Sequence, residues 1–120
     1  MSESGSESRG SEAEPSREDR RLLMLERLVG EGKADAFARY ALALEYRRRR
    51  RTEDALAAFE ALRTAHPDYL PMYLMAGQML TEAASPREAR AWLEQGVSLA
   101  RKAGDQKALG ELEDALSELE

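Results

Sequence analysis

The sequence predicts an all-α protein, a right-handed α-solenoid of antiparallel helix hairpins with about six helices. Apolar residues recur at helical spacing in six successive segments, and no segment alternates with a period of two over a useful length. The pattern of large and small residues in 36–69 returns in 70–103, and a fixed period of this length is typical of stacked helix pairs. We therefore expect helices stacked in a row and no sheet.

Length and composition limit what the chain can be. Its 120 residues with a net charge of −5 predict one domain with a modest core. The absence of cysteine and the single histidine, His66, argue against a metal site, and we expect no cofactor. No apolar stretch is long enough to cross a membrane, so we expect a soluble, cytoplasmic protein that does not associate with membranes.

Residues 1–16 are predicted to be a disordered Ser/Glu-rich tail ahead of a helical domain at 17–120. The segment contains six serines and four glutamates, and Met1 is its only large apolar residue. Such a composition cannot bury enough apolar surface to offset the entropy of ordering. The tail is interpreted as solubilising, with phosphate acceptance by its serines as the alternative.

The first helix is expected over 17–30, flanking the repeats. Ser16 suits the position before a helix, and Glu18 and Asp19 suit its first turn, where acidic groups stabilise the macrodipole. An apolar stripe follows on one face. Gly30 marks the end of the helix.

The next two helices are expected to form a hairpin within 36–69. Asp35 is a candidate cap for the first of them, and Thr52 opens the second, which ends before Pro67. Between them lies the run of arginines from Arg47 to Arg51, which we place in the last turn of the first helix. Because successive residues turn by about 100°, the five side chains are expected to spread around the helix.

A second hairpin is expected within 70–103, followed by a capping helix at 105–119. Ser85, Pro86 and Glu88 have the spacing of a capping box with proline at the first helical position. The last helix carries a stripe of leucines, namely Leu109, Leu112, Leu116 and Leu119.

The two hairpins share one pattern. Leu42, Ala43 and Tyr46 lie on the first helix, and Ala55 and Phe59 on the second. The same offsets 34 residues later hold Ala76, Gly77, Leu80, Ala89 and Leu93. This pattern resembles the tetratricopeptide repeat family, as a small bacterial-type member with about two repeats plus flanking helices. The small residues are expected to let helices approach closely.

The first helix of the hairpin is also apolar on a second side, at Phe37, Tyr40 and Leu44. The resemblance implies that this side lines a concave groove where a protein or peptide partner binds. The family subgroup that grips acidic chaperone C-termini has basic and amide residues there, so this chain lacks that carboxylate clamp. The predicted groove residues are Phe37, Tyr40, Leu44, Arg47, Arg48, Leu74, Gln78 and Glu82.

Three functions remain open. The first is a non-catalytic module that binds a partner segment in the groove. The second is a structural homo-oligomer, in which the groove is filled by a second copy through Phe37, Tyr40 and the leucines Leu109, Leu112 and Leu116. The third, a minor alternative, is nucleic-acid contact through Arg47 to Arg51, which an overall acidic chain disfavours.

No catalytic constellation is found, and we expect no enzymatic activity. His66 precedes Pro67 at a helix end, where a histidine interacts with terminal carbonyls. The sequence around Gly30 and Gly32 lacks the spacing of a phosphate-binding loop.

Overall fold

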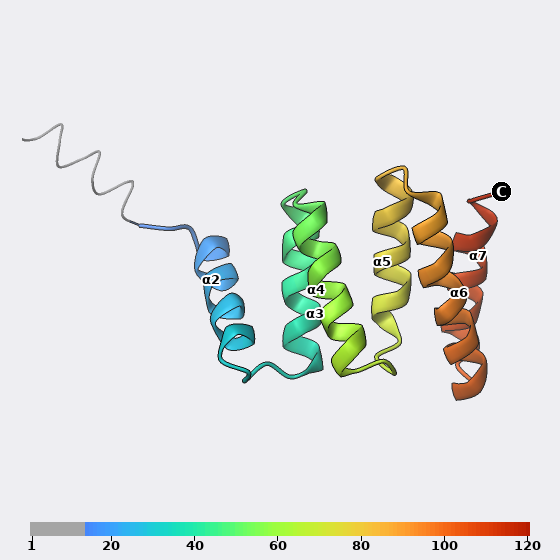
Figure 1. Cartoon of the computed structure of the whole chain (residues 1–120), viewed down its shortest axis with the longest axis horizontal. Coiled ribbons are helices and arrows are strands. Elements are labelled where there is room, and N and C mark those ends of the chain that lie inside the picture. Colours follow the sequence, from blue (N-terminus) through green and yellow to red (C-terminus); the bar gives the residue numbers. More distant parts are fainter. Residues whose placement is uncertain (1–13) are drawn as a thin grey trace, which may run out of the picture.

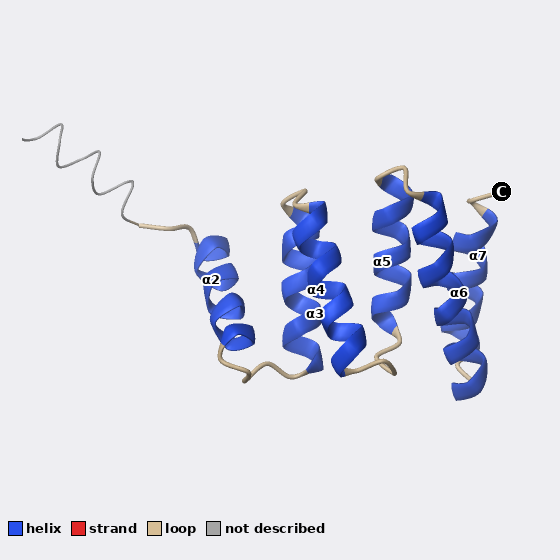
Figure 2. Ribbon diagram, in the orientation of Figure 1, coloured by secondary structure: helices blue, strands red, loops and turns tan. Residues whose placement is uncertain are grey.

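The computed structural model describes residues 14–120, and their regular structure is entirely helical (Figure 2). The helices are α2 (Arg17–Gly30), α3 (Ala36–Arg48), α4 (Thr52–Ala65), α5 (Pro71–Glu82), α6 (Pro86–Ala103) and α7 (Gln106–Ser117). The predicted all-α fold of six helices is confirmed for this range. The predicted disordered tail lies outside the described residues, apart from 14–16.

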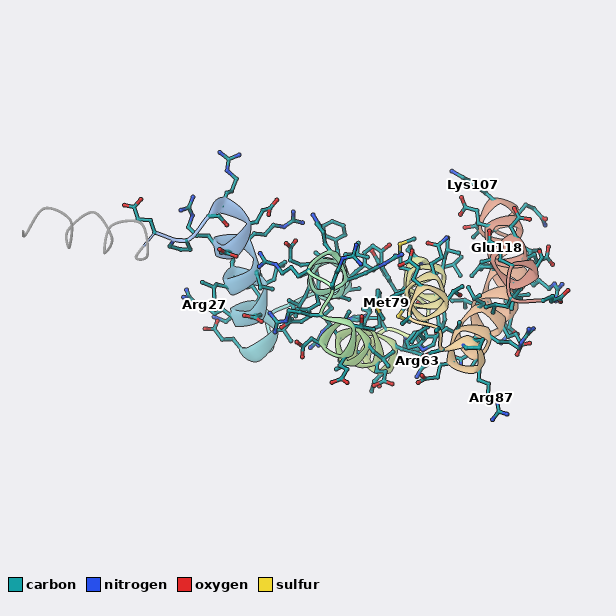
Figure 3. All side chains as sticks on the ribbon, turned by 90° about the horizontal axis from the view of Figure 1, so that it is seen from above. Arg27, Arg63, Met79, Arg87, Lys107 and Glu118 are labelled. Carbon is teal, nitrogen blue, oxygen red and sulfur yellow. The ribbon has the colours of Figure 1, made fainter. Side chains whose placement is uncertain are left out.

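The helices stand in a row and alternate in direction along the chain (Figure 1). Helices α3 and α4 form one hairpin and α5 and α6 the next, with α2 before them and α7 after them. Seen from above, α3, α5 and α7 lie along one side of the row, and α4 and α6 along the other (Figure 3). The helices α3, α5 and α7 begin at residues 36, 71 and 106, at equal spacing.

Side-chain caps start three of the helices. Ser16 Oγ accepts a hydrogen bond from the Asp19 amide at 3.0 Å, and Asp35 Oδ1 accepts one from the Ala38 amide at 2.8 Å. Asp105 caps α7 in the same way. The predicted capping box at Ser85 is wrong, because its side chain makes no capping bond.

Pro86 takes the first helical position of α6. Its fixed φ suits a helix start, and the missing N–H costs nothing there.

The main core extends from α3 to α7 and depends on small residues. Ala43, Ala55 and Ala89 are fully buried. A Cβ on Gly77 would lie 2.4 Å from Leu93 Cδ2, and one on Gly96 would lie 2.7 Å from Tyr73 Cβ. Helices α5, α6 and α7 therefore pack at distances that only glycine allows at these two positions. The largest fully buried apolar side chains are Phe59, Leu62, Met72, Leu93 and Leu112.

The leucine stripe of α7 faces this core. Leu112 is 1% exposed, and Leu109 and Leu116 are partly buried against the same cluster. Leu112 is therefore not available to a second copy, while self-association through Leu109 and Leu116 stays a prediction.

The arginine run is only partly helical. Arg47 and Arg48 lie in the last turn of α3, but Arg49 caps the helix and Arg50 has a φ of 61°. The Arg51 amide donates to the Tyr46 carbonyl at 3.0 Å, which closes the helix end around a left-handed residue. The expectation that the whole run lies in the last turn is therefore corrected. Ala84 ends α5 in the same conformation, with a φ of 59°.

Candidate functional site: a groove beside α3, α5 and α7

The predicted groove residues fall mainly into two neighbouring clefts on the side of the row formed by α3, α5 and α7. We name the first the apolar cleft. It has a volume of about 410 Å³ and lies where α3, the start of α5 and α7 meet. Its lining residues are Tyr40, Leu70, Pro71, Leu74, Met75, Asp105, Lys107, Ala108, Glu111 and Leu112.

We name the second the arginine cleft. It has a volume of about 650 Å³ and lies where α3 and α5 end. Its lining residues are Leu44, Arg47, Arg48, Arg50, Thr52, Met79, Glu82 and Ala83. Three of these carry positive charge and one carries negative charge, so the cleft is cationic in a chain whose net charge is −5.

The structure divides the predicted residues between these sites. Tyr40 and Leu74 meet in the apolar cleft. Gln78 lies farther toward α7, in a shallow depression that also includes Leu74. Phe37 is 67% exposed and lines neither cleft. The residues placed in the arginine cleft are Leu44, Arg47, Arg48 and Glu82.

Tyr40 is held at the apolar cleft by an aromatic contact. Its ring centroid lies 5.2 Å from that of Tyr69, which precedes α5. Burial raises the pKa of the Tyr40 hydroxyl above its usual value, so the group stays neutral across the physiological range. The sequence pattern did not identify Tyr69, because this residue lies in the loop outside the helical period.

Arg47 crosses from α3 to α5 and separates the two clefts. One guanidinium nitrogen donates to Met75 Sδ at 3.6 Å, and the other lies 3.2 Å from both oxygens of Glu82. Met75 lines the apolar cleft and Glu82 the arginine cleft, so the side chain of Arg47 contacts both. Because both oxygens of Glu82 share one guanidinium nitrogen, this pair lacks the parallel two-nitrogen geometry of a bidentate contact.

The remaining arginines of the run contact different helices. Arg48 pairs with Glu45 at 3.3 Å, and Arg49 pairs with Asp19 of α2 at 2.9 Å. Arg51 pairs with Asp54 of α4 at 2.8 Å. The run therefore does not present five charges on a single face.

Glu45 is the one charged side chain that is buried among the described residues, at 2% exposure. It lies on α3 and pairs with Arg48 and with Arg49, the latter at 3.5 Å. A buried carboxylate is costly unless it is paired, and here the pairing is incomplete, because Glu45 Oε1 and Arg49 Nε have no hydrogen-bond partner within residues 14–120. The spacing of four between Glu45 and Arg49 was visible in the sequence, but the burial of Glu45 was not.

Two further polar contacts attach α2 to α3. The hydrogen bond from Arg49, followed by that from Ser16, lowers the pKa of Asp19 below its usual value. The Tyr46 hydroxyl donates to Glu26 Oε2. Burial, together with this hydrogen bond, raises the pKa of Tyr46 to about 12.

Residues 14–120 contain neither a metal-binding cluster nor a membrane-spanning helix. Over that range, no group of three or more His, Cys, Asp or Glu side chains could hold a metal ion. No helix there has both the length and the apolar character needed to cross a bilayer.

The stacked helix hairpins define a helical-repeat protein, a class whose stacked repeats create extended concave surfaces. A tetratricopeptide repeat domain protein from Salinibacter ruber is similar to this chain. Its solution NMR structure is 38% identical with a TM-score of 0.66, covering 71% of this chain and 86% of that one. Its crystal structure is 37% identical with a TM-score of 0.66, covering 72% and 96%.

The chain belongs to the tetratricopeptide repeat family. A protein from Bordetella parapertussis shares the fold, with a TM-score of 0.72 and 24% identity over 88% of this chain and 89% of that one. No family model and no curated protein sequence matches the chain. The resemblance expected from the 34-residue pattern is confirmed by the Salinibacter structures.

Proposed function

We propose that the protein is a non-catalytic interaction module whose groove binds a segment of a protein partner. The observation that carries this proposal is the apolar cleft, which is open at the surface although Tyr40, Leu74 and Met75 line it. An open apolar cleft bordered by charged residues is the usual form of a site that receives a partner's side chain.

The helices of the described range leave this cleft open. Helix α7 contributes Lys107, Ala108 and Glu111 to one wall, while its leucine stripe points into the core. Helix α2 packs on α3 through Leu22 and Leu25, in a separate cluster with Ala41 and Leu42. A partner segment can therefore enter the cleft without displacing a helix of this range.

The other two candidate functions have less support. Self-association through the α7 leucines would have to use Leu109 and Leu116, which are partly buried, because Leu112 lies in the core. Nucleic-acid binding through the arginine run would require charges gathered on one surface, whereas Arg49 and Arg51 pair with carboxylates of α2 and α4.

The test compares two apolar-to-serine changes in a capture experiment. The immobilised full chain is incubated with lysate of the native source, and the retained proteins are quantified by mass spectrometry. We expect Tyr40→Ser to weaken capture about 30-fold or more, because truncating an aromatic hot-spot residue costs about 2 kcal/mol or more.

The matched control is Leu23→Ser, an exposed apolar residue of α2 outside both clefts. It should retain capture, and both variants should keep the helical circular dichroism of the parent. Equal capture by Tyr40→Ser and the parent would rule out the groove as the binding site of the partner. A mass that rises with concentration in light scattering, and falls in Tyr40→Ser, would instead favour a second copy as the occupant.

A further inference from the structure

We propose that the groove selects segments with a particular spacing of two groups: an apolar side chain that enters the apolar cleft, and a carboxylate about three residues away that enters the arginine cleft. This inference rests on the proposed function and names the chemistry of its ligand. The partner is a short acidic segment with an aromatic or aliphatic anchor, bound in an extended conformation.

The spacing follows from positions on one helix. Tyr40 lines the apolar cleft and Arg47 lines the arginine cleft, and both project from α3. Seven residues of α-helix advance by about 10 Å. An extended segment covers about 3.3 Å per residue, so about three residues separate its apolar and acidic groups.

The charge of the arginine cleft favours an acidic group. Arg47, Arg48 and Arg50 line it together with a single carboxylate, Glu82. The side chain of Glu82 is 69% exposed, and an ion pair at such a site is worth little in water. An incoming carboxylate can therefore share the guanidinium of Arg47 at small cost.

Arg47 is partly ordered before a partner arrives. Its side chain is 22% exposed and donates to Met75 Sδ, whereas that of Arg48 is 55% exposed. A side chain that is already ordered loses less conformational entropy on binding. The guanidinium of Arg47 beside the apolar cleft can therefore select a carboxylate at a set distance from the apolar group.

The chain's own segments fit this description less well than a separate partner. Residues 1–16 contain four glutamates, but their only large apolar residue is Met1, so they match the arginine cleft and not the apolar one. In a second copy, Leu112 is buried and cannot serve as the anchor. The exposed Leu23, Met24 and Phe37 lie on helices and not in an extended segment.

The experiment uses a phage-displayed library of random 12-residue peptides, selected on the immobilised full chain. We expect the enriched peptides to share an aromatic or aliphatic residue with Asp or Glu three or four positions away. The most enriched peptide is then synthesised with a fluorescein label, and its dissociation constant is measured by anisotropy on the parent and on charge variants.

Two charge changes should move the dissociation constant in opposite directions. Arg50→Gln removes a cation of the cleft and should weaken binding about two- to fivefold. Glu82→Gln removes the competing carboxylate and should tighten binding by a similar factor. The matched control is Arg87→Gln on the other side of the row, which should leave the constant unchanged (Figure 3).

Three results would overturn the inference. Selected peptides that need Tyr40 but show neither acidic enrichment nor a response to Arg50→Gln and Glu82→Gln would refute the acidic requirement and leave the proposed function standing. A library that yields no peptide whose binding depends on Tyr40 would refute both this inference and the proposed function. A synthetic peptide of residues 1–16 that binds as tightly as the selected one would make the tail the occupant.

Discussion

The two ends of the row are held by different kinds of interaction. At the carboxyl end, α7 buries Leu112 and Ala115 in the main core. At the amino end, α2 packs only Leu22 and Leu25 against α3, in a small separate cluster. Polar contacts supply the rest of the attachment of α2, among them the ion pair of Asp19 with Arg49 and the hydrogen bond of Tyr46 with Glu26.

The two end helices also differ in what they expose. Helix α7 buries Leu112 and Ala115, and its Lys107 and Glu111 line the apolar cleft. The amino end differs, because α2 exposes Leu23 at 56% and Met24 at 55%.

The largest expected effect tests the strength of the two attachments. Leu112→Ala should lower the free energy of unfolding by about 3 kcal/mol, because it leaves a cavity in a well-packed core. Leu25→Ala should cost about 2 kcal/mol, because fewer neighbours surround it. Urea unfolding followed by circular dichroism measures both.

Hydrogen exchange shows which helices lose stability in each of the two variants. Leu25→Ala should raise exchange in α2 alone, whereas Leu112→Ala should raise it across α5, α6 and α7. If Leu112→Ala raised exchange in α7 alone, this helix would be attached as loosely as α2.

The next effect concerns the charges that attach α2. Arg49→Gln removes the partner of Asp19 and one partner of the buried Glu45, so α2 should open more readily. Amide exchange in α2 should rise more than in Arg51→Gln, which breaks only the exposed pair with Asp54. Equal exchange in the two variants would show that the Asp19 pair adds nothing to the attachment.

The same ion pair predicts an acid-sensitive amino end. The pKa of Asp19 lies below its usual 3.8, with the hydrogen bond from Arg49 as the main cause. Its contribution to stability is therefore present above pH 3.8 and is lost as the pH falls through the lowered pKa. On acidification through this pKa, exchange in α2 should rise in the parent and should rise less in Arg49→Gln, which lacks the partner of Asp19. An equal rise in both proteins would contradict the assignment to this ion pair.

A smaller effect is expected from Tyr46→Phe. Loss of the hydrogen bond to Glu26 should cost about 1 kcal/mol at pH 7, measured by urea unfolding. The pKa of Tyr46 is raised from 10.0 to about 12, so the stability due to its retained proton is full below pH 10 and is lost as the pH approaches 12. An ultraviolet titration should show one tyrosine fewer ionising near pH 12 in the variant, and an unchanged titration would remove Tyr46 from this role.

The smallest expected effect is a gain in stability at the exposed side of α7. A Cβ on Gly110 would meet no atom within 4 Å, so Gly110→Ala should stabilise the protein by about 0.5 to 1 kcal/mol through helix propensity. The control is Gly104→Ala, where the space is equally open but φ is 69°, and which should destabilise the protein. Destabilisation by Gly110→Ala would show that something covers this side of α7.

Much of the fold could be predicted from local patterns. The caps at Ser16 and Asp35 depend on residues three positions apart, and such short-range contacts are visible in sequence. The close approach at Gly77 was indicated by the 34-residue pattern, which places a small residue where two helices meet. Ser85 had the same kind of signal but makes no capping bond.

The candidate site was less accessible to sequence analysis. The helical period placed Tyr40 and Leu44 on one side of α3, but it did not show that they line different clefts. The division arises because Arg47 reaches Met75, a contact between residues 28 positions apart. Phe37 shares the period and yet lines neither cleft, because neighbouring helices do not extend over it.

Local patterns in the sequence were enough to predict the helices, their order and the family, because hydrophobic period, capping residues and the 34-residue repeat are properties of short stretches of chain. Helix packing in three dimensions was needed to show that Glu45 is buried, that the arginine run contacts four helices, and that α7 places Leu112 in the main core. These features depend on which faces meet when helices pack, and packing joins residues that are far apart in the chain.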